Sequence, residues 1–233
     1  MNEVISKDKI STTSVMAGSQ VAARLSFGAA AASLVLLGAL HILSPEFDPS
    51  WRMVSEYANG GYSWVLSLMF ATWAVSAWAL AYAIWPQVKT TGGKIGLVLL
   101  VVAGVGEAMG GLFDINHPLH GLAALIGIPT FPIAAMLISV SLVSTQPWAG
   151  SRKALLWTAN LTWISVLLMA AAFIVMIVTF TQSGAEMPAE GAVVTTLPAG
   201  VIAFVGWANR FLVVAYNAWA MTVAGRAAES LVK

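Results

Sequence analysis

Residues 44–62 have the sequence SPEFDPSWRMVSEYANGGY, which is the longest polar segment between the apolar runs of this chain. The segment contains three of the ten acidic residues and separates two runs that are each long enough to cross a bilayer. The chain has 233 residues, of which 59% are hydrophobic and only 9% are charged. A soluble domain has about 25% charged residues. The composition therefore predicts an all-α integral membrane protein, whose partner is the lipid bilayer.

The apolar runs predict six membrane-spanning helices, because each run has the length that a bilayer requires. We expect a bundle of six spans at residues 21–43, 63–85, 95–113, 121–143, 155–180 and 197–224. The first run is too long for a signal peptide and should remain in the mature protein. Pro129 and Pro132 lie inside the fourth run, where a kink is expected rather than a break. Pro198 falls in the first turn of the sixth run, where a missing N–H costs nothing.

The distribution of lysine and arginine predicts the orientation of the bundle. With the N-terminus inside, the cytoplasmic segments contain Lys7, Lys9, Arg24, Lys89, Lys94, Arg152, Lys153, Arg226 and Lys233. The opposite side contains Arg52 alone, and Arg210 lies within a span. We therefore expect a protein of the inner (cytoplasmic) membrane with both termini in the cytoplasm. Its parts would be a disordered tail at 1–20, a membrane domain at 21–226 and a second tail at 227–233.

The polar segment itself is expected to form a short helix in the first outer loop, at the membrane interface. Asp48 precedes a proline, which is a helix start signal, and Asn59 is followed by two glycines, which end helices. Trp51 is suited to the headgroup region. Arg52 and Glu56 are four residues apart and can pair. On these patterns alone we favour an interfacial cap over the bundle rather than a catalytic loop.

Two charged residues lie within predicted spans, where charges are costly and usually face the interior of a bundle. Glu107 belongs to the third span and Arg210 to the sixth. We predict that they pair or share a polar cavity with Asn209 and Asn217. A buried ion pair that only fixes helix packing and a ligand site are both open interpretations.

Small residues are frequent in the spans, as in the Gly106–Gly110 segment of the third run. Patterns of this kind let helices approach closely, either between two copies of a chain or within one bundle. We favour packing within one bundle, and a homo-oligomer is the second interpretation of the pattern.

The three histidines, His41, His117 and His120, are all expected near the outer boundary, at the same level as several carboxylates. Histidine nitrogens and carboxylate oxygens are the ligand types of zinc and other divalent sites, so these histidines are candidate metal ligands. His120 with Asp114 or Glu56 could instead form an acid–base pair at the depth of lipid headgroups. Histidines that only form hydrogen bonds at the boundary are the simpler interpretation of the pattern.

Several function classes are disfavoured by the sequence. The chain has no cysteine, which excludes a disulfide framework and a cysteine nucleophile. It has no basic block with interleaved aromatic residues, so a nucleic-acid partner is not expected. It also lacks a Gly-rich phosphate loop, a Gly-x-Ser-x-Gly motif and a His-Glu-x-x-His motif.

Three groups of residues form a recognisable pattern: Ser44-Pro45 to Asp48-Pro49 with Arg52-Met53-Val54-Ser55-Glu56-Tyr57 and Gly61; Gly111-Leu112-Phe113 with His120-Gly121; and Gly206-x-x-x-Arg210-Phe211 with Trp219. With these groups the chain resembles a bacterial six-span membrane family catalogued as domain of unknown function 998. The resemblance extends from about Ala22 to Ala224. The family is also loosely similar to membrane proteins of the Frag1/DRAM/Sfk1 type, which share a Ser-acidic motif in the first outer loop.

The resemblance implies a six-span fold and marks the motif residues as candidate functional positions, but it implies no activity. This chain also departs from the family's pattern after the third span, where Asp114-Ile115-Asn116 stands in place of Pro-Thr-Asp. The acidic position can therefore correspond to Asp114 or to Asn116. Glu107 is not a family hallmark.

Our leading hypothesis is an outer-facing polar pocket that binds a lipid headgroup or another small amphiphile. Arg210 would be the anion partner in this pocket. The candidate ligand-binding residues are Arg52, Ser55, Glu56, Glu107, Asn209 and Arg210. A second hypothesis is a membrane-embedded hydrolase or transferase that uses His120 with Asp114 or Glu56, with or without a divalent metal. A small transporter is a third hypothesis, and a structural or regulatory membrane protein is a fourth.

Overall fold

The computed structural model describes the backbone of residues 2–185 and 195–230 and the side chains of residues 16–185 and 195–229. This part of the chain is all-helical and contains no strand. Its elements are α1 (Asn2–Leu43), η1 (Val54–Asn59), α2 (Ser63–Ile84), α3 (Thr91–Leu112), α4 (His120–Val143), η2 (Gln146–Ser151), α5 (Arg152–Gln182) and α6 (Val205–Ser230). The prediction of an all-α membrane-type fold is confirmed at this level.

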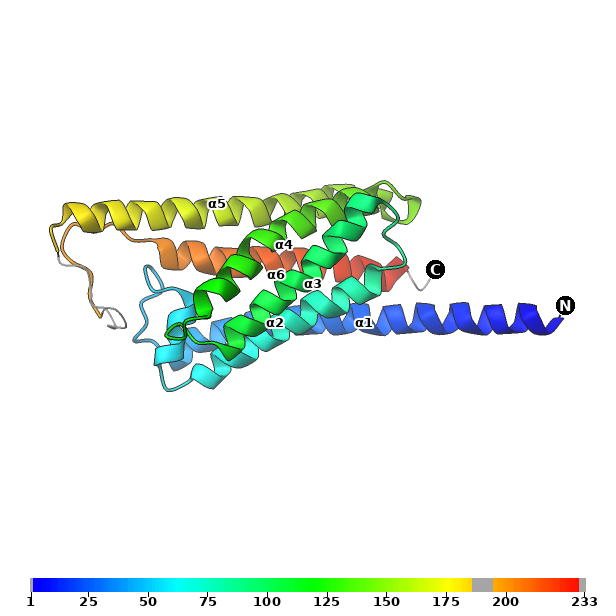
Figure 1. Cartoon of the computed structure of the whole chain (residues 1–233), viewed down its shortest axis with the longest axis horizontal. Helices are drawn as coiled ribbons and strands as arrows, with labels where there is room; N and C mark the ends of the chain where they lie inside the picture. The colour runs from blue at the N-terminus through cyan, green and yellow to red at the C-terminus, as the bar shows by residue number, and fades with distance from the viewer. Residues whose placement is uncertain (1, 186–194, 231–233) are drawn as a thin grey trace.

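The six long helices run alternately up and down, so that the connections alternate between the two ends (Figure 1). The end with the α1–α2, α3–α4 and α5–α6 connections also contains η1, and we call it the η1 end. Both termini lie toward the opposite end. Helix α6 packs against α1 and α5 and also touches α2, which brings the first and last helices side by side.

Five segments of the described residues have the length and hydropathy of membrane spans: Met16–Leu43, Ser63–Ile84, Thr91–Leu112, His120–Val143 and Gln146–Gln182. Helix α6 is not among them, although it is 26 residues long. It contains Asn209, Arg210 and Asn217, and the last two are buried between neighbouring helices. Buried polar residues such as these lower the hydropathy of α6, and they face neighbouring helices rather than the outside of the bundle. Its role as a span stays a prediction.

The boundaries of the first and last helices differ from the expected ones. Helix α1 begins at Asn2, so it includes most of the segment expected to be a disordered tail. The chain has no proline before Pro45 that would stop this helix. Helix α6 begins at Val205, and residues 197–204 are not helical. The predicted start at Leu197, with Pro198 in the first turn, is therefore wrong.

The polar segment contains a shorter helix than predicted. Helix η1 is a single 3₁₀ segment that begins after Met53, not after Asp48. The Asp48 carboxylate instead accepts hydrogen bonds from the backbone N–H and the hydroxyl of Ser50, at 2.8 and 2.7 Å. These two bonds lower the pKa of Asp48. The predicted end is confirmed, because η1 stops at Asn59 and Gly60 follows in an extended conformation.

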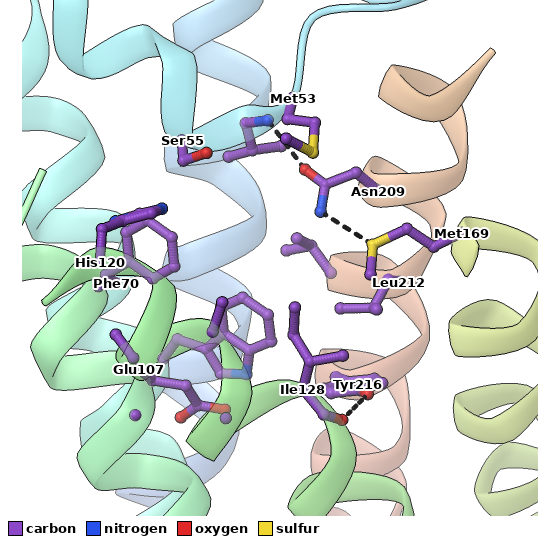
Figure 2. Close-up of a pocket in the computed structure, with 18 of the residues that line it drawn as sticks. Met53, Ser55, Phe70, Glu107, His120, Ile128, Met169, Asn209, Leu212 and Tyr216 are labelled. Atoms are coloured by element: carbon purple, nitrogen blue, oxygen red, sulfur yellow. Dashed lines mark hydrogen bonds between the residues drawn. The ribbon is translucent and has the colours of Figure 1, made fainter. Parts of the chain in front are cut away.

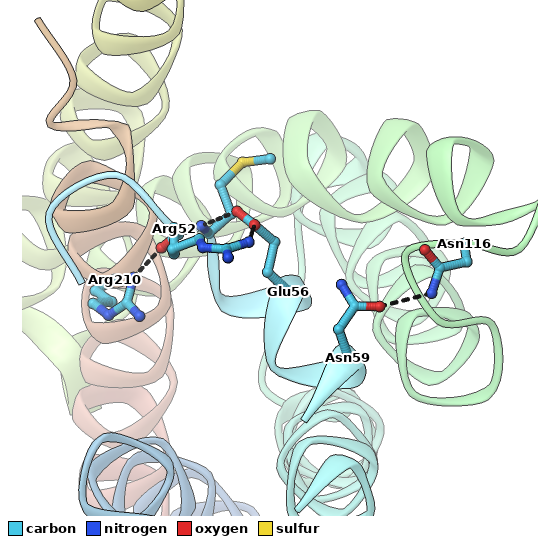
Figure 3. Close-up of polar contacts among 6 residues, drawn as sticks. Arg52, Glu56, Asn59, Asn116 and Arg210 are labelled. Atoms are coloured by element: carbon cyan, nitrogen blue, oxygen red, sulfur yellow. Dashed lines mark hydrogen bonds and ion pairs between the residues drawn. The ribbon is translucent and has the colours of Figure 1, made fainter. Parts of the chain in front are cut away.

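The predicted pair of Arg52 and Glu56 is present, but it is not an exposed surface pair. The two side chains lie 2.6 Å apart, and Arg52 is only 5% exposed. Glu56 also accepts the backbone N–H of Met53 at 2.8 Å, which fixes the first turn of η1. Asn116 donates to Asn59 at 2.9 Å and joins the end of η1 to the α3–α4 connection (Figure 3). The segment is thus held by bonds within itself and by one bond to the α3–α4 connection.

Candidate functional site

A cavity of about 240 Å³ lies inside the bundle toward the η1 end (Figure 2). Helices α2, α3, α4 and α6 form most of its wall, Met169 of α5 adds to it, and residues 53–55 cover it. Its lining is mainly apolar or aromatic: Met53, Val54, Ser55, Phe70, Trp73, Gly106, Glu107, Gly110, Ile115, His120, Ala123, Ala124, Gly127, Ile128, Met169, Asn209, Leu212, Val213 and Tyr216.

The space exists because small residues line it from α3 and α4. Gly106 packs against Gly127 so closely that an added Cβ would lie 2.7 Å from the Gly127 Cα. The two helix backbones therefore touch beside the cavity. Gly110, Ala123 and Ala124 have too little side chain to fill the volume next to this contact. The interpretation of the small residues as packing within one bundle is confirmed for Gly106.

Glu107 lines this cavity without a protein partner. Its side chain is only 5% exposed, and neither carboxylate oxygen has a hydrogen-bond partner among the described residues. The indole Nε1 of Trp73, another lining residue, also lacks a partner there. Buried polar groups are normally hydrogen-bonded, so two unpartnered groups on one cavity need an explanation.

The predicted ion pair between Glu107 and Arg210 is wrong. The Arg210 guanidinium donates to the carbonyls of Arg52 and Gly206 at 2.6 and 3.0 Å. It also donates to the Tyr57 hydroxyl at 3.0 Å and to the His41 ring at 2.7 Å. Arg210 therefore joins α6 to α1 and to residues 52–57, as the bond to Arg52 in Figure 3 illustrates. It does not line the cavity.

Both ring nitrogens of His41 have protein partners, one of which is Arg210. The Nδ1–H of His41 donates to the Leu37 carbonyl at 2.7 Å, while Nε2 accepts from Arg210. Both nitrogens are occupied by protein partners, which leaves His41 no free position for a metal ion.

The other histidines do not form a metal site with it. His117 Nδ1 accepts the Leu119 N–H at 3.1 Å, and His120 Nδ1 donates to the Phe113 carbonyl at 2.9 Å. No group of three or more His, Asp or Glu side chains in residues 16–185 and 195–229 is placed to hold a metal ion. The geometry of the described residues therefore does not support the predicted set of His41, His117 and His120.

The residues proposed for acid–base chemistry are likewise separate in the structure. Asp114 accepts the backbone N–H of Asn116, and Glu56 is paired with Arg52. Neither carboxylate lines the cavity, whereas His120 does. No hydrogen bond between His120 and an acidic side chain is present in the described part of the chain.

Two predicted ligand-binding residues do lie at the cavity, near its η1 end. Asn209 accepts the Val54 N–H at 2.8 Å through its side-chain oxygen and so holds the covering segment on α6. Ser55 lines the cavity next to it (Figure 2). Ser55, Asn209 and Glu107 thus all line the cavity, with Glu107 farther from Ser55, whereas Glu56 and Arg210 do not line it.

The pattern of polar residues did not identify Tyr216, although a proline on α4 explains its position. Pro132 has no N–H, so it cannot bond to the Ile128 carbonyl four residues earlier. The Tyr216 hydroxyl donates to this free carbonyl at 2.6 Å. The Tyr216 ring also stacks on Phe131, with ring centroids 4.2 Å apart. A proline inside an apolar run, with a tyrosine on another run, is the signal that could have found this contact.

The family model described as protein of unknown function (DUF998) matches residues 27–226. The chain belongs to the DUF998 family. Comparison with curated proteins and with solved structures finds no match. The match confirms the family resemblance, and the resemblance to the Frag1/DRAM/Sfk1 type stays a prediction. In this DUF998 protein the whole candidate site lies inside the matched region, including the covering segment, Glu107 and Tyr216.

The absence of a protein partner for Glu107 has a measurable consequence for this DUF998 protein. Replacing Glu107 with methionine removes a buried carboxylate and keeps a similar volume. We expect the free energy of unfolding to rise by about 1–3 kcal/mol, because buried polar groups without partners are destabilising. Reversible unfolding in SDS, followed by circular dichroism, measures this change.

The matched control is Glu56→Met, which removes a carboxylate that has two partners. This variant leaves Arg52 and the Met53 N–H unpaired, so we expect it to lose about 1–3 kcal/mol. A loss of stability in Glu107→Met as large as that in Glu56→Met would mean that Glu107 does have a protein partner.

Proposed function

We propose that this DUF998 protein binds a small amphiphile in the cavity between α2, α3, α4 and α6. The observation that carries the proposal is a mainly apolar cavity with an unpartnered buried carboxylate in its wall. Sites for small molecules are typically apolar, with a few polar groups that orient the ligand. Glu107 is such a group, and its burial is unfavourable unless a ligand or a proton compensates it.

The rim of the cavity supports an amphiphile rather than a purely apolar ligand. Ser55, His120 and Asn209 place hydrogen-bonding groups near the η1 end, whereas Phe70 and Leu212 are apolar. The excess of lysine and arginine in the other connections argues that the η1 end faces the outside. A molecule in the cavity would then meet polar groups at this rim and at Glu107, with an apolar wall between them.

The enzyme and transporter hypotheses have less support. A hydrolase or transferase would need His120 beside a carboxylate, and among the described residues the two predicted carboxylates have different partners. A transporter based on a Glu107–Arg210 relay would need contact between these residues, and Arg210 is instead bound to residues 41–57 and Gly206. We therefore retain ligand binding as the proposed function.

Filling the cavity tests this proposal. Ala124 lines the cavity, so Ala124→Leu adds three carbon atoms to its wall. We expect native mass spectrometry of the wild-type protein to detect a co-purified small amphiphile, and at least a tenfold lower occupancy in Ala124→Leu. The control is Ala171→Leu, which makes the same change at an exposed position of α5 that is not in the lining.

Equal occupancy in Ala124→Leu and Ala171→Leu would place the bound molecule elsewhere. A wild-type protein that carries nothing, and that takes up no amphiphile from lipid nanodiscs, would contradict the proposal.

A further inference from the structure

Three aromatic rings lie next to one another along the wall of the cavity. The rings of Trp73 and Tyr216 have centroids 6.0 Å apart and pack edge to face at 75°. Phe70 lies nearly parallel to Trp73, with centroids 6.1 Å apart. All three residues line the cavity together with Glu107. Groups of aromatic rings are a recurrent feature of protein sites that bind organic ammonium groups.

The charge of the cavity favours a cation. Glu107 is the only Asp, Glu, Lys or Arg side chain among the lining residues. Arg210 is held by its own partners, so no basic side chain in the described residues neutralises this carboxylate. Figure 2 shows Glu107 and Tyr216 on two different helices, both at a distance from Ser55. One face of Tyr216 is covered by Phe131, so the carboxylate and the indole of Trp73 are the main groups that this end of the cavity offers a ligand.

We propose that the cavity selects an organic ammonium cation, with Glu107 as its counterion and the rings of Trp73 and Tyr216 around it. This inference rests on the proposed function, because it names the class of amphiphile that the same cavity takes. A neutral ligand would leave the Glu107 carboxyl group unpaired or protonated, and an anion would be repelled by its ionised form. A cation gains an ion pair in a mainly apolar cavity, and also an attraction to the aromatic rings.

The unpartnered indole N–H of Trp73 adds a second feature to the ligand. It is a donor without an acceptor in the described residues, so it can donate to an oxygen on the same molecule. The cavity volume of about 240 Å³ lies below the range of drug-sized sites, which is roughly 300–1,000 Å³. The expected class is therefore a compact amine or quaternary ammonium compound with a short apolar part.

A pair of compounds with equal shape tests the role of charge. Benzyltrimethylammonium and neopentylbenzene have the same number of non-hydrogen atoms and differ by replacement of the charged nitrogen with carbon. Equilibrium dialysis with the protein in nanodiscs, corrected with empty nanodiscs, gives the affinity for each compound. We expect the wild-type protein to bind the cation at least tenfold more tightly than its neutral isostere.

Variants of Glu107 and Trp73 then test whether the preference for the cation over its neutral isostere arises in the cavity. Glu107→Gln keeps the side-chain shape, and we expect it to lose at least tenfold in affinity for the cation, with little change for the neutral isostere. Trp73→Leu should weaken cation binding as well. The comparison of the two compounds on the wild-type protein needs no variant, so it remains decisive even if a variant fails to fold.

The outcomes separate this inference from the proposed function. If both compounds bind equally and both are lost in Ala124→Leu, the cavity is a ligand site without charge selectivity, and the ammonium proposal is overturned. If the cation binds equally to the wild-type protein, Ala124→Leu and Glu107→Gln, it is bound outside the cavity, and the ammonium proposal fails. If neither compound binds, the inference fails, whereas the native mass spectrometry above still decides whether another amphiphile is bound.

Discussion

Replacing Arg210 with methionine is expected to lower the free energy of unfolding by about 3 kcal/mol or more. Arg210 is 4% exposed and donates to His41, Arg52, Tyr57 and Gly206. Its removal leaves buried carbonyls without a donor, and each unsatisfied group adds about 1–3 kcal/mol. Arg210→Lys should recover only part of the loss, because a lysine cannot donate in several fixed directions.

Arg226→Met is the matched control on the same helix. Arg226 pairs with Glu229 at 2.9 Å, but the two side chains are 50% and 68% exposed. An exposed pair of this kind contributes about 0–1 kcal/mol. Unfolding in SDS, followed by circular dichroism, compares the variants. Equal stability of Arg210→Met and Arg226→Met would show that Arg210 does not hold the covering segment on the bundle.

Gly206→Ala is expected to destabilise the protein by about 3 kcal/mol, although alanine is normally favoured over glycine in helices. A Cβ at Gly206 would lie 2.6 Å from the Arg52 carbonyl oxygen and 2.9 Å from the Trp51 nitrogen, and closer still to the Pro49 carbonyl oxygen. These atoms are backbone and cannot rotate away. The residues from Pro49 to Val54 would therefore have to move off α6, and the cover of the cavity would move with them.

Gly225→Ala provides the control for helix propensity, because it makes the same change further along α6. An added Cβ there meets only Phe27, at 3.8 Å, which is an ordinary contact. We expect this variant to be stabilised by about 0.5–1 kcal/mol. Thermal unfolding in detergent, followed by tryptophan fluorescence, measures both changes. Two variants of equal stability would contradict the close packing of residues 49–54 on Gly206.

The sequence predicted the number of long helices well, because long apolar runs have few structural alternatives in a lipid environment. It predicted the polar segment less well. The Asp48-Pro49 signal indicates a helix start, yet Asp48 forms a turn with Ser50 and the helix begins after Met53. The deciding contact is the bond from Val54 to Asn209, and a residue 155 positions away is not visible to a local pattern.

The error on Glu107 and Arg210 has a similar cause. Depth along a helix follows from residue number, whereas the direction of a side chain around the helix depends on packing. The predicted start at Leu197 also placed Arg210 too deep: α6 begins at Val205, so Arg210 lies in its second turn and bonds to the segment before η1, whereas Glu107 faces the cavity. Of the six predicted ligand-binding residues, Ser55, Glu107 and Asn209 line the cavity, and their role as a binding site stays a prediction. It missed Trp73 and Tyr216, because aromatic residues in spans usually belong to the core or to the interface.

A structure of the purified protein determined with benzyltrimethylammonium tests the central claim most directly. The account predicts density for the cation inside the cavity, against the Glu107 carboxylate and the faces of Trp73 and Tyr216. It also predicts that Arg210 keeps its bonds to Arg52 and Tyr57. An empty or collapsed cavity, with Glu107 paired to Arg210, would contradict the account.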